Sequence, residues 1–143
     1  MEQKVGIMTE KTHKVSFSKI IQSGNYSAFI LQANKKQFAI YTLPSTGIQI
    51  EDILGNKNKR PQTHQLIDTI LSGLDVSINK VVLSEVRENV YCSKLILSKK
   101  NEDIEDILEI DARPSDSLLL ALKHDIDVLC TQQVLDASPS FVE

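Results

Sequence analysis

The chain has 143 residues, of which 41% are hydrophobic and 24% are charged, so one globular domain can bury roughly 68–70% of its extended surface. A formal net charge of −3 at pH 7 excludes a global basic field, and any site for a polyanion must therefore be a local patch. With 5% aromatic residues and no tryptophan, the composition leaves little for a base-stacking platform.

The first part of the chain predicts a lead-in, three strands and two helices. Residues 1–13 are expected to form the lead-in, and β-branched and aromatic residues separated by Gly and Asn predict the strands. A short helix should follow Pro44 and end at Gly55. Thr63 is the expected N-cap of a second helix, because apolar residues recur at helical spacing over 66–74. The expected strands are 14–21, 26–32 and 37–43.

The second part predicts a hairpin, a further strand, a deeply buried helix and a last strand. Residues 99–106 are mostly charged and are expected to form a solvated loop. The apolar block 118–122 has no polar side, so the helix that begins at Pro114 should be the most buried one. One helical turn at 131–135 and a frayed tail at 137–143 should close the chain. The expected strands are 80–86, 90–98, 107–111 and 126–130.

This order of elements predicts the fold class. Strands and helices in mixed runs argue for a single α+β domain over residues 14–136, with a mixed, largely antiparallel sheet packed against two or three main helices. An Arg-Pro pair precedes an apolar helical run twice, at Arg60-Pro61 and at Arg113-Pro114. This repetition suggests an internal duplication around the two helix starts.

Cellular location and cysteine use follow from the same sequence. No apolar run approaches the roughly 18 residues that span a bilayer, and the N-terminus lacks the layout of a signal peptide. We therefore expect a cytoplasmic protein without a membrane partner. Cys92 and Cys130 each lie in a β-like apolar run without a CxxC partner, and we expect two buried free thiols. His13 and His124 have no evident partner and are expected at the surface.

The corner at Arg113-Pro114 has two interpretations. Proline suits the first helical position, and Ser115 and Asp116 can cap free N–H groups at the positive end of the helix dipole. Alternatively, Asp111 and Asp116 could hold a divalent cation such as Mg²⁺ or Mn²⁺ while Arg113 clamps a phosphate. Local chemistry leaves both interpretations open.

The corner at Arg60-Pro61 offers acid–base chemistry. Arg60 supplies a cation beside a helix start, and His64 lies in the first helical turn, where it could act as general base or acid on a phosphodiester. Asp68 follows one turn later and could orient the imidazole. The alternative is a solvent-facing histidine on the polar side of an amphipathic helix.

The same two corners carry a resemblance to a known family. One motif is Arg60-Pro61-X-Thr63-His64-X-Leu66, and the other is Ile110-Asp111-Ala112-Arg113-Pro114-Ser115-Asp116. Together they resemble the bacterial and plant bifunctional nuclease domain family, over nearly the whole chain. The resemblance implies a compact α+β domain and, from the activity reported for some plant members, cleavage of both RNA and DNA.

The motif-matched positions, combined with the chemistry of each side chain, give the expected site. His64, Asp111 and Asp116 are the expected catalytic residues, and the two aspartates would also hold the metal. The expected phosphate-binding residues are Arg60, Thr63, Arg113 and Ser115.

Three positions depart from the family pattern. Gln65 stands where an aspartate commonly follows the Thr-His pair, and Ser117 stands where an alanine usually ends the last motif. Thr46 falls where a glutamate is expected. A carboxylate is therefore missing at two family positions, which leaves Asp111 and Asp116 as the better-supported acids.

The leading hypothesis is a nuclease, a phosphodiester hydrolase with DNase or RNase activity, assisted by a divalent cation and partnered by nucleic acid. The alternative is a non-catalytic regulatory module that uses the same corners to bind an anion or a protein. A third interpretation is structural, with the Arg-Pro residues holding the fold and the chain self-associating as a homo-oligomer. Sequence leaves open whether the two corners share one cleft.

Overall fold

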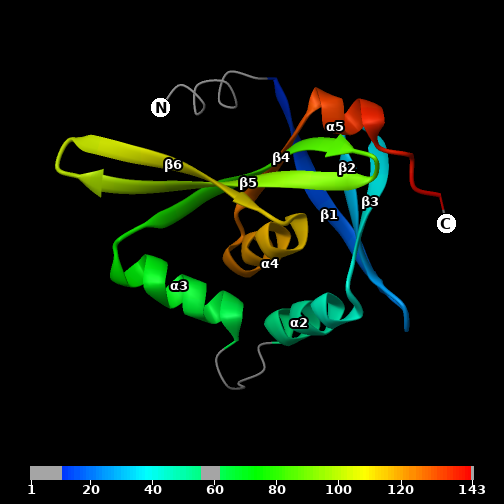
Figure 1. Ribbon diagram of the computed structural model, residues 1–143, viewed down its shortest axis with the longest axis horizontal. Helices are drawn as coiled ribbons and strands as arrows, with labels where there is room; N and C mark the ends of the chain where they lie inside the picture. The colour runs from blue at the N-terminus through cyan, green and yellow to red at the C-terminus, as the bar shows by residue number, and fades with distance from the viewer. Residues whose placement is uncertain (1–10, 56–61, 143) are drawn as a thin grey trace.

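The computed structural model describes residues 11–55 and 62–142, in which seven strands form one sheet that packs against helices (Figure 1). The strands are β1 (Thr12–Gln22), β2 (Ser27–Ala33), β3 (Lys36–Thr42), β4 (Ser77–Arg87), β5 (Val90–Asn101), β6 (Ile104–Ala112) and β7 (Asp127–Thr131). The described helices are α2 (Pro44–Leu54), α3 (Thr63–Gly73), α4 (Pro114–His124) and α5 (Gln132–Ala137). None of them combines the length and the apolar character that crossing a bilayer requires. The predicted α+β class is confirmed.

Strand β7 joins two antiparallel halves of the sheet, whose spatial order is β3-β2-β1-β7-β4-β5-β6. It pairs antiparallel with β1, where Val15 lies opposite Val128, and parallel with β4, where Val81 lies opposite Val128. All other neighbouring strands run antiparallel. The parallel pair needs a long crossover connection, and the chain between β4 and β7 supplies one that includes α4.

The core lies between the sheet and α4. Leu118 and Leu120 are almost fully buried among sheet residues such as Phe29, Leu31 and Leu83. Figure 1 shows α4 between α2 and α3, beneath the strands β4 and β5, while α5 lies at the opposite end of the molecule. Residues 117–121 of α4 are all buried, whereas α3 contains no buried residue. The prediction that this apolar helix is the most buried one is confirmed.

The prediction of a solvated loop at 99–106 is wrong. The ladder between β5 and β6 continues to its tip, with Lys99 opposite Asp106 and Lys100 opposite Glu105. Opposite charges that face each other across strands stabilise such a pair. Glu102 turns the chain with a left-handed backbone, at φ 56°. A charged composition therefore marked an exposed hairpin and not an irregular loop.

Two smaller expectations are also wrong. The N-cap of α3 is Gln62 and not Thr63, because the Gln62 N–H donates to Gln65 Oε1 at 2.6 Å. Cys130 is buried as predicted, but Cys92 is exposed, and both thiols are free. In a strand that is buried on one face, alternate residues point away from the core, and periodicity did not show on which face Cys92 lies.

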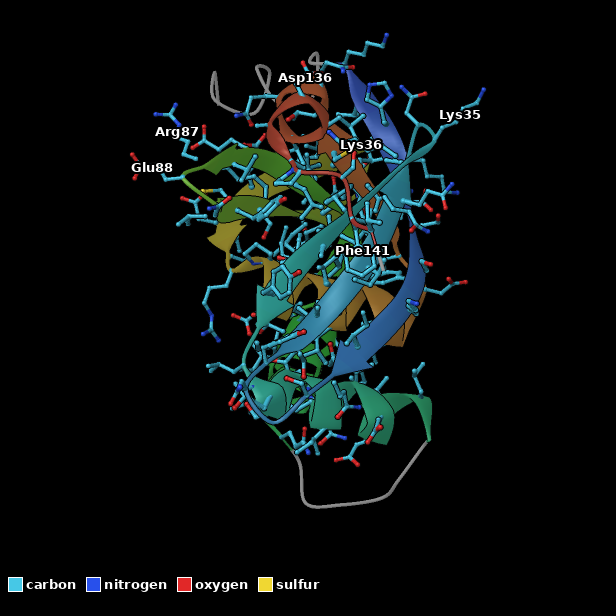
Figure 2. All side chains as sticks on the ribbon, turned by 90° about the vertical axis from the view of Figure 1, so that its right-hand side faces the viewer. Lys35, Lys36, Arg87, Glu88, Asp136 and Phe141 are labelled. Carbon is cyan, nitrogen blue, oxygen red and sulfur yellow. The ribbon has the colours of Figure 1, made fainter. Side chains whose placement is uncertain are left out.

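The segment after α5 packs back onto the sheet. Ser138 is buried and accepts a hydrogen bond from the Tyr91 hydroxyl at 2.8 Å. The Phe141 N–H donates to Gln37 O, at 2.8 Å, and Lys36 donates to Leu135 O at the end of α5. Figure 2 shows this segment descending from α5 past Lys36 to Phe141. The contacts fix the segment against the outer edge of β3.

Truncating Leu118 should reveal how far the fold depends on α4. Leu118 has 0% exposure, so Leu118→Ala removes buried surface and leaves a cavity, which should lower the free energy of unfolding by about 3 kcal/mol or more. Leu54→Ala is the matched control, because Leu54 is 67% exposed and should change stability by about 0.5 kcal/mol or less. Urea denaturation measures both, and equal losses would contradict this core.

The two thiols should differ in reactivity. Burial raises the pKa of Cys130 to about 11, so at pH 8 it offers almost no thiolate, while Cys92 lies at the surface. A thiol-specific reagent should modify Cys92 in the folded protein and Cys130 only after denaturation. Cys92→Ser should abolish the native-state reaction. Fast labelling of that variant without denaturant would show that Cys130 is accessible.

Candidate functional site

The buried middle of α4 fixes this helix in place. Its two ends carry the polar residues of the candidate site. Asp116 lies in the first turn, and Lys123 and His124 lie in the last. An acid at the N-terminus and cations at the C-terminus both interact favourably with the helix dipole.

At the N-terminal end of α4, Arg113 forms an ion pair with Asp116. Arg113 is the N-cap residue of α4, with an extended backbone, and Pro114 occupies the first turn. The guanidinium donates from Nε to Asp116 Oδ2 at 2.8 Å and from Nη2 to Oδ1 at 3.1 Å. These hydrogen bonds and the carboxylate charge raise the pKa of Arg113. Because both side chains are well exposed, water screens the pair and it adds little stability.

Asp111 lies close by in sequence but binds a different cation. Its carboxylate accepts from Lys94, the residue opposite it on β5, and its side chain is 85% exposed. Asp111 and Asp116 therefore neutralise separate cations. Over residues 11–55 and 62–142, no three His, Cys, Asp or Glu side chains are grouped so that they could hold a metal ion.

Behind this corner a buried serine pair links α4 to the sheet. Ser93 on β5 donates to Ala112 O at 2.6 Å, and its hydroxyl lies 2.8 Å from that of Ser117. Ser93 is 2% exposed and Ser117 is 0% exposed. Buried hydroxyl groups are costly when unpaired, so this network fixes the angle at which the chain turns from β6 into α4.

Arg113 and Pro114 form part of the wall of two surface cavities. One cavity, of about 960 Å³, contains Tyr41, Tyr91 and Phe141, together with Ser115. The other, of about 900 Å³, contains Glu85, Cys92, Lys94 and Asp111. The expected phosphate-binding residues Arg113 and Ser115 thus reach open space. Three of the chain's few aromatic residues gather beside them.

At the C-terminal end of α4, one carboxylate joins two helices. Asp68 on α3 accepts from Lys123 Nζ and, at 2.7 Å, from His124 Nε2. The Asp68 side chain is 17% exposed, so water screens these contacts less than those of Arg113 and Asp116. The expectation that His124 has no partner is wrong. We call His64, Asp68, Lys123 and His124 the interhelical cluster.

His64 is the fourth member of the interhelical cluster. Its Nδ1 atom is buried and has no hydrogen-bond partner among the described residues. Burial is the largest cause that lowers the pKa of His64, and the charges of Lys123 and His124 lower it further, while Asp68 opposes them. The imidazolium form would bury an N–H without an acceptor. Protonation of His64 is therefore disfavoured.

A cavity of about 530 Å³ opens beside the interhelical cluster. Asp68 and His124 line it, together with Ser72, Asp75 and Ser77. His124 keeps a side-chain exposure of 39%, so its ring is accessible from this cavity. A ligand in this cavity could reach Asp68 and His124 without unfolding either helix.

The structure separates the residues that the two sequence motifs predicted. His64 lies with Asp68 at one end of α4, whereas Asp111, Arg113 and Asp116 lie at the other. Asp116 and Lys123 are seven residues apart, which is about 10 Å along the helix axis. Arg60 and Pro61 lie outside the described residues, and Thr63 begins α3 with an exposed side chain.

Sequence reasoning missed Lys123 and His124. Cations in the last turn of a helix have an ordinary reason to be there, and nothing in their spacing points to α3. One available signal was Asp68, which lies on the same helical face as His64. A half-buried carboxylate requires a cationic partner, and Asp68 is half buried.

Comparison with known proteins places this geometry in a family. Residues 29–143 match the model of the bifunctional nuclease domain. The chain belongs to the bifunctional nuclease domain family. Two uncharacterized proteins of Mycobacterium tuberculosis, from strains CDC 1551 / Oshkosh and ATCC 25618 / H37Rv, are each 28% identical to it over 81 residues. The aligned part is 57% of this chain and 45% of each relative, so the chain spans less than half their length.

The three departures from the bifunctional nuclease pattern all make hydrogen bonds inside the fold. Gln65 accepts from the Gln62 N–H at the start of α3. Thr46 is 7% exposed, and its hydroxyl lies 3.0 Å from that of Thr42. Ser117 joins the buried serine pair. At these positions the chain uses neutral donors and acceptors to hold its helix starts.

The pKa of His64 should lie below its ordinary value of 6.5 and should depend on Lys123. Lys123→Met removes a cation that opposes protonation, so the pKa of His64 should rise. Lys14→Met is the control, because Lys14 pairs with Asp127 on β7. NMR titration of the histidine resonances, assigned with His64→Gln, measures the shift. A wild-type value at or above 6.5 would contradict the described environment.

Proposed function

We propose that this bifunctional nuclease domain cleaves phosphodiester bonds of nucleic acid at the interhelical cluster. The observation that carries the proposal is the convergence of two histidines, a lysine and an aspartate from α3 and α4. Proton transfer to and from the reacting oxygens, together with a cation for the phosphate, is the chemistry that such a bond requires. Membership of a nuclease-named family supports the same reaction class.

Each side chain of the interhelical cluster has a defined role in this proposal. His64, whose pKa is lowered by burial, is the candidate general base. Lys123 stabilises the negative charge that develops on the phosphate. His124 is the general acid, and Asp68 is a positioning residue that orients its ring through Nε2.

In this proposal the residues around Arg113 bind the same substrate, away from the interhelical cluster. Arg113 and Ser115 face open cavities and would bind the phosphate of a neighbouring nucleotide, with Thr63 contributing near His64. The phosphate-binding role of Arg60 stays a prediction from the sequence. Phosphate contacts position a nucleic acid chain and carry no sequence information. The separation along α4 therefore suits a chain of nucleotides better than a single small substrate.

A divalent cation at Asp111 and Asp116 does not fit the geometry well. Each carboxylate already neutralises a cation, Lys94 or Arg113, so a metal ion would have to displace both partners. Mg²⁺ and Mn²⁺ need several oxygen ligands at one point, and these two side chains point to different cations. We assign no step of the reaction to a metal, and the catalytic role of the two aspartates remains a prediction.

Removing either histidine of the interhelical cluster should abolish most activity. His64→Ala and His124→Ala should each lower kcat by about 10²-fold or more, since each takes away a proton-transfer group. Asp68→Asn should lower kcat with little change in KM, because it disturbs the orientation of His124 and not substrate contact. Hydrolysis of a fluorescent single-stranded oligonucleotide measures these effects.

His13→Ala is the matched control for these variants. His13 lies on β1 and bonds with Gln132, away from the interhelical cluster, so its removal should leave kcat unchanged. Equal activity in the wild type, in His64→Ala and in His124→Ala would point to a contaminating nuclease and would contradict the proposal. Thermal melts of every variant separate loss of chemistry from loss of folding.

The second candidate function is a non-catalytic module that binds an anion or a protein. The observation in its favour is that Arg113, Ser115 and three aromatic residues line a cavity of about 960 Å³ at the N-terminal end of α4. Such a module would bind oligonucleotide with an affinity that falls with salt and would show no turnover. Turnover that is lost with His64→Ala would exclude it.

A further inference from the structure

We infer that the cavity of about 960 Å³ between the edge of β3 and the start of α4 binds an unpaired nucleotide of a single strand, with its base stacked on Tyr41. We call this cavity the stacking groove, and its lining includes Tyr41, Tyr91, Arg113, Ser115 and Phe141. The inference rests on the proposed function for the class of substrate and adds a binding site away from the interhelical cluster. Single strands of RNA and DNA should both bind here, because every base has an aromatic face and stacking does not involve the sugar.

Tyr41 is the aromatic side chain that the stacking groove presents to a ligand. It lies on β3, and its exposed fraction is 61%. The ring of Tyr26 meets it edge-on, with the ring centroids 5.3 Å apart and the planes at 74°. Such a contact supports the ring of Tyr41 and covers at most one of its faces. The other face is therefore open to a base.

The two other aromatic rings of the stacking groove are fixed by contacts of their own. Tyr91 stacks on Phe38, with the ring centroids 6.3 Å apart, and its hydroxyl donates to Ser138 Oγ. The N–H of Phe141 donates to Gln37 O on β3. Because these contacts hold the walls in place before a ligand arrives, binding orders few side chains and costs less free energy.

The charge of the stacking groove favours an anionic ligand with a flat apolar part. The chain contains 19 acidic and 16 basic residues, yet of the described residues that line the groove only Arg113 is charged. Asp116 accepts from Nε and Nη2 of Arg113, which leaves the N–H donors of Nη1 for a phosphate. Leu43 and Val90, each 64% exposed, add apolar surface. A cation beside aromatic and aliphatic side chains fits a phosphate joined to a base.

Stacking on Tyr41 requires a base that is free of its own neighbours. In a duplex the bases stack on one another and present only their edges in the grooves. A base of a single strand can be splayed out and placed against an aromatic side chain. The stacking groove should therefore select single strands over duplexes, whether the sugar is ribose or deoxyribose.

The binding experiment compares single strands with duplexes of one mixed sequence. Fluorescence anisotropy of end-labelled RNA and DNA gives each Kd, and gel electrophoresis after each titration confirms that the strands are intact. We expect similar Kd values for the two single strands and values at least about tenfold higher for the two duplexes, since a stacked base contributes about 1–3 kcal/mol.

Substitutions at Tyr41 test the stacking itself. Tyr41→Ala should raise the Kd for both single strands about tenfold or more, and Tyr41→Phe should restore binding, because stacking uses the ring and not the hydroxyl. In hydrolysis assays Tyr41→Ala should raise KM and leave kcat unchanged, since the stacking groove binds substrate away from the reacting bond. Leu54→Ala is the matched control, because Leu54 is 67% exposed on α2 and lies outside the stacking groove.

The outcomes separate this inference from the proposed function. Duplexes that bind as tightly as single strands, or a Kd that Tyr41→Ala leaves unchanged, would overturn the inference while cleavage by the wild type would leave the proposed function standing. Binding that depends on Tyr41 without cleavage of any strand would support the inference and overturn the proposed function. No binding of any strand would overturn both.

A second copy of the chain is the competing occupant of the stacking groove. Analytical ultracentrifugation of the wild type and of Tyr41→Ala tests it. A dimer that Tyr41→Ala dissociates, with an unchanged Kd for single strands, would assign the groove to self-association and overturn the inference. Thermal melts check that each variant is folded, and Tyr41→Leu replaces Tyr41→Ala if that variant is not.

Discussion

Burial of α4 is the constraint on which the rest of this structure depends. Residues 117–121 are enclosed by the sheet, and the buried hydroxyl groups of Ser93 and Ser117 fix the start of the helix. Because a core packed at crystal-like density leaves little freedom, the helix cannot rotate or slide without leaving cavities. Both of its polar ends are therefore held at fixed positions. The interhelical cluster depends on this, since half of it belongs to α4.

The two ends of α4 use their charges in different ways. Arg113 and Asp116 form an exposed pair that water screens, whereas Asp68 brings Lys123 and His124 together in a less exposed place. Lower exposure strengthens electrostatic effects, and this is why the pKa of His64 responds to its neighbours. We therefore propose proton transfer at the C-terminal end of α4 and phosphate recognition at its N-terminal end.

The family motifs and the proposed site of chemistry share His64 but otherwise consist of different residues. The Arg-Pro motifs lie at helix starts, and their departures Gln65, Thr46 and Ser117 all make hydrogen bonds that hold such starts in place. A motif of this kind identifies the bifunctional nuclease domain because it specifies how the chain turns from strand to helix. Lys123 and His124 lie outside both motifs and are joined to α3 through the carboxylate of Asp68.

The amino-acid sequence by itself determined the elements, the α+β class, the burial of α4 and the family, because periodicity, helix-start chemistry and motifs are local properties. It also predicted His64 as a proton-transfer group, which stays a prediction. Only the tertiary structure decided that Lys99–Asn101 pairs with β6, that Cys92 faces solvent and that His64 shares its surroundings with Lys123 and His124. These relations join residues far apart in the chain. They depend on which side of a strand or helix meets the core, and the sequence pattern does not encode how two helices pack against each other.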